Sequence, residues 1–134
     1  MARILVIEDT PTVSRVLARL LERAGHQVVV RPTADEALDV VRAESVDLVL
    51  TDIFLPGKNG LALIRELGER YPRVPVIAIT GGDARWDADV LGAATEAGAV
   101  AALRKPFGSD VLLGAVARAL GERTDDPQPG TEGG

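Results

Sequence analysis

The chain has 134 residues and a mass of 14.1 kDa, which is about the size of one domain. Hydrophobic residues make up 46% and charged residues 26% of it, a balance typical of a folded protein and not of a disordered chain. The net charge of −5 argues against direct nucleic-acid or membrane-surface partners, and the absence of cysteine excludes disulfides and zinc-thiolate sites. No apolar stretch approaches the ~18 residues that cross a bilayer. We therefore expect one soluble, cytoplasmic domain.

Five short apolar runs alternate along the chain with segments of helical period. The runs are residues 4–7, 28–30, 46–50, 74–79 and 99–103. Apolar and polar residues do not alternate within them, which is typical of parallel strands that helices cover on both faces. The pattern predicts an α/β fold of three layers, in which a doubly wound, five-stranded parallel sheet lies between five helices.

Helix signals follow the first two runs. Thr10 as N-cap, Pro11 at the first helical position and Gly25 past the end delimit the first helix. Thr33, with Glu36 three residues later, predicts a capping box at the start of the second. The first helix is predicted to bury an apolar stripe made of Val13, Val16, Leu17, Leu20 and Leu21.

The last helix is predicted to start at Ser109, which is its candidate N-cap. Its apolar stripe comprises Val111, Leu112, Ala115, Val116, Ala119 and Leu120. Residues 122–134 contain no apolar side chain and four acidic ones, so we predict a disordered acidic tail there. The folded domain is predicted to span residues 2–121.

Polar side chains stand at the ends of four of the five predicted strands. Glu8 and Asp9 follow the first strand, Asp52 the third, Thr80 the fourth and Lys105 the fifth. Ligands of open α/β sheets bind at the carboxyl ends of the strands. We therefore expect these five residues to form a single site.

Three neighbouring carboxylates repel one another and need a compensating cation. A set of oxygen ligands favours Mg²⁺ over zinc, and Mg²⁺ together with Lys105 would balance the three negative charges. An aspartate can attack phosphorus to form an acyl phosphate while cations and a hydroxyl bind the phosphoryl oxygens. Asp52, at the end of the expected central strand, is the best placed acceptor.

These motifs resemble the receiver domain of two-component response regulators, and the resemblance covers about residues 3–121. The matching motifs, in order, are Glu8-Asp9, Asp52 with Leu55-Pro56 and Gly60, Thr80-Gly81, and Lys105-Pro106-Phe107. The resemblance implies a flavodoxin-like strand order of 2-1-3-4-5.

The resemblance also implies a role for each site residue. Asp52 would be the phosphoacceptor, and the Mg²⁺ ligands would be Glu8, Asp9, Asp52 and the backbone carbonyl of Phe54. Thr80 and Lys105 would bind the phosphoryl oxygens, and the peptide bond before Pro106 would be cis. The phosphodonor would be a histidine kinase or a histidine phosphotransfer protein.

No output domain follows the last helix, so we expect a stand-alone receiver. It would bind an unknown downstream protein or act as a phosphate shuttle or sink, and it would catalyse only its own phosphotransfer and dephosphorylation. Receivers usually carry an aromatic residue where this chain has Ala102. We therefore expect its signal to pass through the Gly81-Gly82 loop and the fourth helix.

Two alternatives belong to other classes. A metal-dependent aspartyl phosphatase of the haloacid dehalogenase pattern would carry a second aspartate at the position of Phe54. A non-phosphorylated flavodoxin-like binding module would carry a phosphate-binding loop after the first strand, where Glu8 and Asp9 instead present negative charge.

Overall fold

The computed structural model describes residues 2–54, 59–80 and 87–124. Strands and helices alternate through them in the order β1(Arg3–Ile7), α1(Pro11–Arg23), β2(Gln27–Arg31), α2(Ala34–Ala43), β3(Leu48–Asp52), α3(Gly60–Arg70), β4(Val76–Thr80), α4(Asp87–Ala97), β5(Ala101–Arg104) and α5(Ser109–Thr124). Within this described part, the helices are all too short or too polar to cross a membrane.

The five strands form one parallel sheet in the order β2-β1-β3-β4-β5, which confirms the predicted architecture. The register decides which strand ends become neighbours. Ile7 lies opposite Thr51, and Asp52 lies opposite Ile79. The residues that follow β1 therefore lie beside Asp52, and Thr80 lies one position beyond it on β4.

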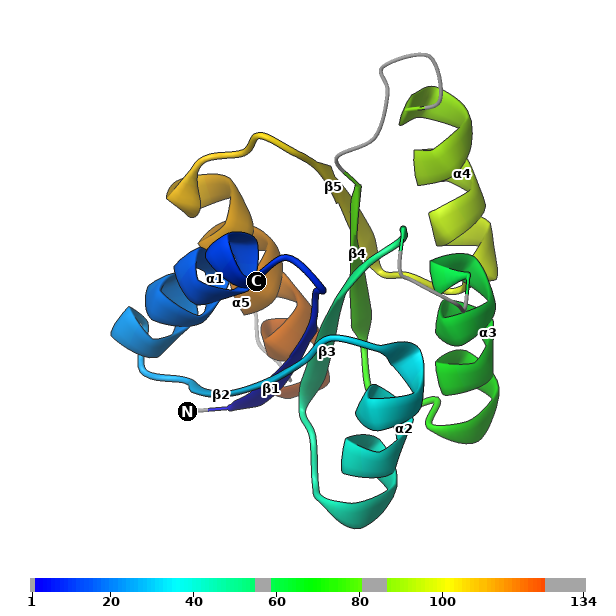
Figure 1. The fold of residues 1–134 in the computed structure, drawn as a ribbon, viewed down its shortest axis with the longest axis horizontal. Helices are drawn as coiled ribbons and strands as arrows, with labels where there is room; N and C mark the ends of the chain where they lie inside the picture. The colour runs from blue at the N-terminus through cyan, green and yellow to red at the C-terminus, as the bar shows by residue number, and fades with distance from the viewer. Residues whose placement is uncertain (1, 55–58, 81–86, 125–134) are drawn as a thin grey trace.

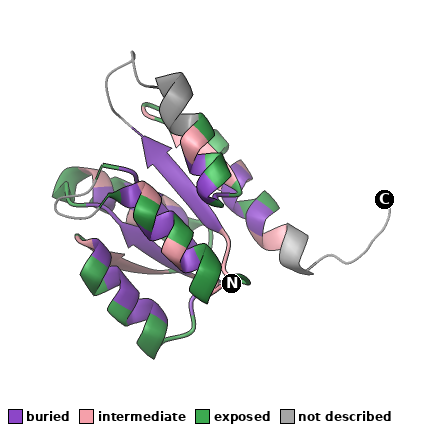
Figure 2. Cartoon of the chain, turned by 90° about the vertical axis from the view of Figure 1, so that its right-hand side faces the viewer, coloured by how far each residue is buried: buried purple, intermediate pink, exposed green. Residues whose placement is uncertain are grey.

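Helices cover both faces of the sheet, with α1 and α5 on one side and α2, α3 and α4 on the other (Figure 1). Successive strand residues point to opposite faces, so each strand serves two cores. In β1, Ile4 and Val6 pack with α1 and α5, whereas Leu5 and Ile7 pack with the other three helices. Figure 2 shows the consequence: the central strands are buried along their length, and the helices are buried on one side only.

The predicted boundaries of the first helix and the predicted start of the second are present, but the side chain of Thr10, the N-cap residue of α1, makes no capping hydrogen bond. Pro11 is the first residue of α1, and Gly25, after its end, has a φ of +96°, a conformation that glycine adopts without a Cβ clash. The Thr33 side chain accepts a hydrogen bond from the Glu36 N–H at 3.2 Å, which confirms the cap. In a full capping box the Glu36 carboxylate would accept a hydrogen bond from the Thr33 backbone N–H. Here that carboxylate accepts from the Thr33 hydroxyl instead.

Three predictions for α1 and α5 need correction. Ser109 is the first residue of α5 and not its cap, because the Gly108 carbonyl accepts the first helical hydrogen bond, from the Leu112 N–H. Val16 and Val111, both placed in buried stripes, are 58% and 46% exposed. Both valines come directly before a buried leucine in the sequence. Because successive residues of a helix are rotated by about 100°, a side chain next to one that faces the sheet turns toward solvent.

The end of α5 also bears on the predicted domain boundary. The helix continues to Thr124, three residues beyond the predicted end of the folded domain. Residues 125–134 lie outside the described part of the chain, so the disordered tail stays a prediction.

Candidate functional site

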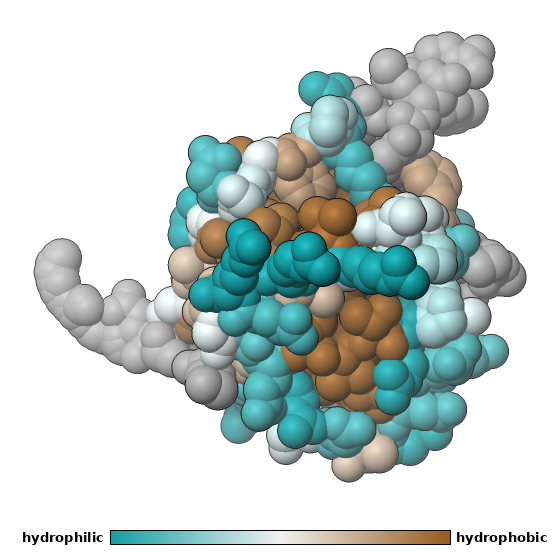
Figure 3. Space-filling model, turned by 60° about the vertical axis from the view of Figure 1, so that its left-hand side comes forward, coloured by the Kyte–Doolittle hydropathy of each residue, from teal (hydrophilic) through white to brown (hydrophobic). Residues whose placement is uncertain are grey.

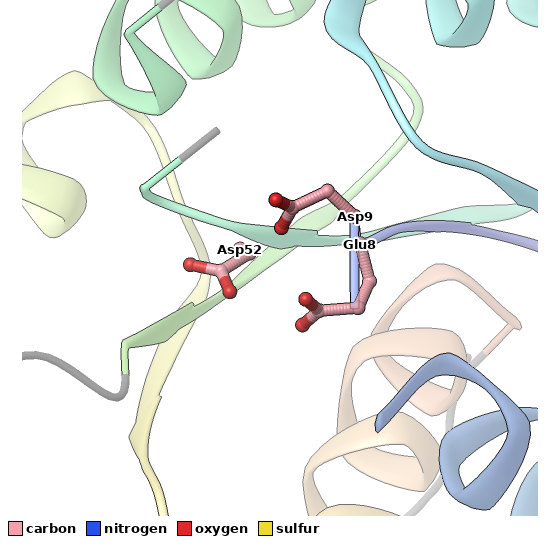
Figure 4. A group of neighbouring side chains, drawn as sticks. All are labelled: Glu8, Asp9 and Asp52. Carbon is pink, nitrogen blue, oxygen red and sulfur yellow. The ribbon is translucent and has the colours of Figure 1, made fainter. Parts of the chain in front are cut away.

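The ends of β1 and β3 bring three carboxylates together. Glu8 and Asp9 follow β1 directly, Asp52 is the last residue of β3, and one oxygen of each lies within 4.8 Å of the others (Figure 4). Glu8 and Asp52 are only 3% and 7% exposed, whereas Asp9 is exposed. The three carboxylates therefore lie close together, as their positions at the strand ends predict.

Backbone amides hold the two buried carboxylates in place. The Thr10 N–H donates to Glu8 Oε2 at 3.1 Å, and the Phe54 N–H donates to Asp52 Oδ1 at 2.9 Å. The fully buried Thr51 hydroxyl donates to the Asp52 backbone carbonyl at 3.0 Å. The sequence predicts no role for Thr51, because a threonine next to the last residue of a strand carries no signal beyond strand propensity.

Lys105 supplies the positive charge of the site. Its Nζ lies 3.0 Å from Glu8 Oε1 and 3.2 Å from Asp52 Oδ2, so it bridges the two buried acids. Burial alone would lower the pKa of Lys105, but its hydrogen bonds to Glu8 and Asp52 and their negative charges outweigh burial and raise that pKa above its ordinary value. The lysine therefore stays charged throughout the neutral range. Its ion pairs stabilise the fold below the ordinary lysine pKa, and that contribution is lost only as the pH rises past the raised value.

Thr80 and Phe54 complete the surroundings of Asp52. Thr80 ends β4 and is 1% exposed, while the Phe54 side chain lies at the surface and is 51% exposed. The Lys105 N–H donates to the Thr80 carbonyl at 2.7 Å, which ties the ends of β4 and β5 together. The peptide bond between Lys105 and Pro106 is cis, as the resemblance implies.

Two further predictions concern the region around β4 and β5. Ala102 is half-buried opposite Ala78 and contributes only a methyl group to the core. Gly81 and Gly82, through which we expect the signal to pass, lie outside the described residues, as do Leu55 and Pro56 of the Asp52 motif.

Gly60 closes the loop that follows Asp52. Its N–H donates to the Ile53 carbonyl at 2.9 Å, and a Cβ at this position would lie 2.3 Å from that oxygen and 2.6 Å from the Ile53 Cα. No real Cβ tolerates backbone atoms so near, and therefore only glycine fits. Gly60 thus fixes the position at which the chain packs back against Ile53, next to Asp52 and Phe54.

The sheet and its polar edge match a known family. The family model for the response regulator receiver domain matches residues 4–117. The chain belongs to this family.

Similar proteins share this receiver domain within longer chains. The chain is 34% identical over 124 residues to the DNA-binding transcriptional regulator NtrC of Klebsiella pneumoniae, covering 92% of this chain and 26% of that protein. It is 38% identical over 121 residues to the C4-dicarboxylate transport transcriptional regulatory protein DctD of Pseudomonas aeruginosa, covering 88% of this chain and 25% of that protein. The receiver domain therefore spans about a quarter of the length of these curated relatives.

A solved structure shares the fold along nearly its whole length. The response regulator receiver domain protein from Clostridium thermocellum has a TM-score of 0.84 and 32% sequence identity to this chain. The match covers 92% of this chain and 97% of that one. The three-layer arrangement and strand order thus agree with those of a solved receiver domain.

The donor atoms of this receiver domain fit a hard divalent cation. Three carboxylates converge, while Lys105 is the one cation in contact with them among the described residues. Carboxylate oxygens are the ligands that Mg²⁺ prefers in proteins, and close acids without compensation destabilise a fold. Glu8, Asp9 and Asp52 are therefore the residues that would hold Mg²⁺, with the Phe54 carbonyl as a fourth candidate ligand.

Mg²⁺ is expected to raise the Tm of the receiver domain, and Asp9→Asn is expected to remove most of that rise. Asp9 is the most exposed of the three acids and makes no hydrogen bond to the described residues, so this substitution removes a charge without breaking the bridge through Lys105. At a concentration one hundred times the Kd, a bound ion adds about 2.7 kcal/mol to the free energy of unfolding. Thermal denaturation with and without MgCl₂ measures the effect.

Asp39→Asn is the matched control, since Asp39 is an exposed carboxylate on α2 that lies outside the acidic group. It should keep the full rise in Tm. An equal rise in the wild type and in Asp9→Asn would contradict a metal site at these carboxylates.

Proposed function

We propose that this receiver domain is the phosphoacceptor of a two-component phosphorelay, with Asp52 as the residue that is phosphorylated. The observation that carries the proposal is the bridge from Lys105 to both Glu8 and Asp52. In this bridge a cation lies 3.0 Å from a candidate metal ligand, Glu8, and 3.2 Å from the proposed nucleophile, Asp52. Structural ion pairs are common at protein surfaces, but here both acids are buried at the edge of the sheet where ligands bind.

In the proposed reaction, an Asp52 carboxylate oxygen attacks the phosphorus atom of a phosphohistidine. The new bond joins that oxygen to phosphorus, the bond from phosphorus to the imidazole nitrogen breaks, and its electron pair stays on the histidine. Lys105 is close enough to Asp52 to follow the incoming phosphoryl oxygens, and the hydroxyl of Thr80 would donate to one of them. Mg²⁺, when bound, would neutralise the negative charge that gathers on these oxygens.

We infer that the donor is a histidine kinase or a histidine phosphotransfer protein. The receiver would then signal by binding a downstream protein, or pass the phosphoryl group on as a shuttle or sink. It would work in the cytoplasm, without direct nucleic-acid or membrane contact, and would catalyse only its own phosphotransfer and dephosphorylation. The name of NtrC includes DNA binding, but this chain matches about a quarter of NtrC. DNA binding is therefore not part of this proposal.

The proposal is tested by incubating the protein with acetyl phosphate and MgCl₂ and measuring its intact mass. We expect one phosphoryl adduct that survives acid, is lost in base, and does not form when EDTA removes the metal. Continuous release of inorganic phosphate without an adduct would instead support the aspartyl phosphatase. Neither adduct nor release would support the non-phosphorylated binding module.

A further inference from the structure

The outer side of α1 carries three exposed arginines that are spaced one helical turn apart. Arg15, Arg19 and Arg23, which we call the arginine row, stand at intervals of four residues. Like charges at this spacing face each other and destabilise a helix. Along the described ranges of the chain, none of the three forms an ion pair. No ion pair within the described residues offsets this repulsion, which points to a role outside the fold for the arginine row.

An apolar groove runs beside the arginine row. It has a volume of about 410 Å³, and it lies between α1 and the segment after β5. Its lining residues are Thr12, Val13, Val16, Leu17, Leu20, Lys105, Pro106 and Phe107. Val16, which is 58% exposed, stands between the groove and the arginines.

A second hollow joins the groove to the arginine row. It has a volume of about 500 Å³, and it shares Thr12, Val16 and Leu20 with the groove while the three arginines line the rest. The side of the molecule on which α1 lies carries strongly hydrophilic and apolar areas next to one another (Figure 3). This combination suits a protein helix with apolar and acidic residues side by side. A nucleic acid would leave the exposed valine against a charged backbone, and the net charge of −5 would oppose it.

The groove also reaches the phosphorylation site. Lys105 lines the groove and binds Asp52 at the same time. A protein that brings a phosphohistidine to Asp52 must therefore cover surface next to Lys105, and α1, about 20 Å long, is the adjoining element. The partner that covers the groove is thus the one that also reaches the arginine row.

We propose that the arginine row selects, among phosphodonors, those whose docking helix carries acidic residues beside its apolar face. This inference rests on the proposed function, because the partner is taken to be the donor for Asp52. The chain as a whole is negative, so the attraction comes from close contact with the three arginines and should weaken as salt is added.

The test uses two phosphorylated versions of one histidine phosphotransfer domain, which differ only in whether the residues flanking the phosphohistidine are acidic or basic. The receiver variant is Arg19→Glu, which turns both repulsive pairs of the arginine row into attractive ones, so its Tm should not fall. The wild type should accept phosphate from the acidic version about tenfold faster than from the basic one. Arg19→Glu should lose this preference and keep the wild-type rate with acetyl phosphate, which needs no docking.

Arg73→Glu is the matched control, because it makes the same charge change at an exposed position after α3. It should keep the preference. An unchanged preference in Arg19→Glu would overturn the inference, as would duplex DNA that binds the wild type and not the variant. Failure of acetyl phosphate to label the wild type would instead overturn the proposed function.

Discussion

Asp52→Asn is expected to abolish phosphorylation by acetyl phosphate, so that no adduct appears under conditions that label the wild type fully. An amide oxygen lacks the negative charge and the nucleophilicity of a carboxylate, and it cannot form an acyl phosphate. The replacement has nearly the same shape, and its amide oxygen can still accept the hydrogen bond from the Phe54 N–H. The loss should therefore be chemical and not a failure to fold.

Intact mass and thermal denaturation, measured together, separate these two causes. Asp39→Asn, which changes an exposed acid on α2 in the same way, should be labelled like the wild type. An adduct of undiminished yield on folded Asp52→Asn protein would place the phosphoryl group on another residue and refute the assignment of Asp52.

Gly60→Ala is expected to lower the free energy of unfolding by about 2–4 kcal/mol, a value that combines overpacking with the loss of one hydrogen bond. The added methyl group would meet the backbone of Ile53 at 2.3–2.7 Å, and backbone atoms cannot turn aside as a side chain can. The loop from Ile53 to Gly60 must then open, which breaks the bond from the Gly60 N–H to the Ile53 carbonyl. Denaturant unfolding measures the loss.

Gly68→Ala provides a control within the same helix. A Cβ at Gly68 meets nothing within 4 Å, so alanine should stabilise α3 by about 0.5–1 kcal/mol. At temperatures where both variants are folded, Gly60→Ala should also be phosphorylated more slowly, because the displaced loop carries Phe54 and its hydrogen bond to Asp52. Equal stability of the two variants would show that the loop can relax around a methyl group.

Local patterns explain why much of the fold could be predicted. The apolar run of β1, the capping threonine at position 33 and the glycine at position 25 each act within a few residues of chain. Their effects depend on periodicity and backbone preference, which a sequence displays directly. The polar residues at strand ends could likewise be assigned to one edge, because parallel strands all end on the same side.

Contacts between segments far apart in the chain explain why the remaining features of the fold and the site could not be predicted from the sequence. The sequence alone predicted that Glu8, Asp9, Asp52 and Lys105 lie at one edge of the sheet, since each stands where a strand ends. Only the tertiary structure decided that Lys105 bridges two acids from different strands, that Gly60 lies against Ile53, and that Val16 faces solvent. These features depend on strand register and on how each helix is rotated against the sheet, and both are set by packing across the whole domain and not by any one stretch of chain.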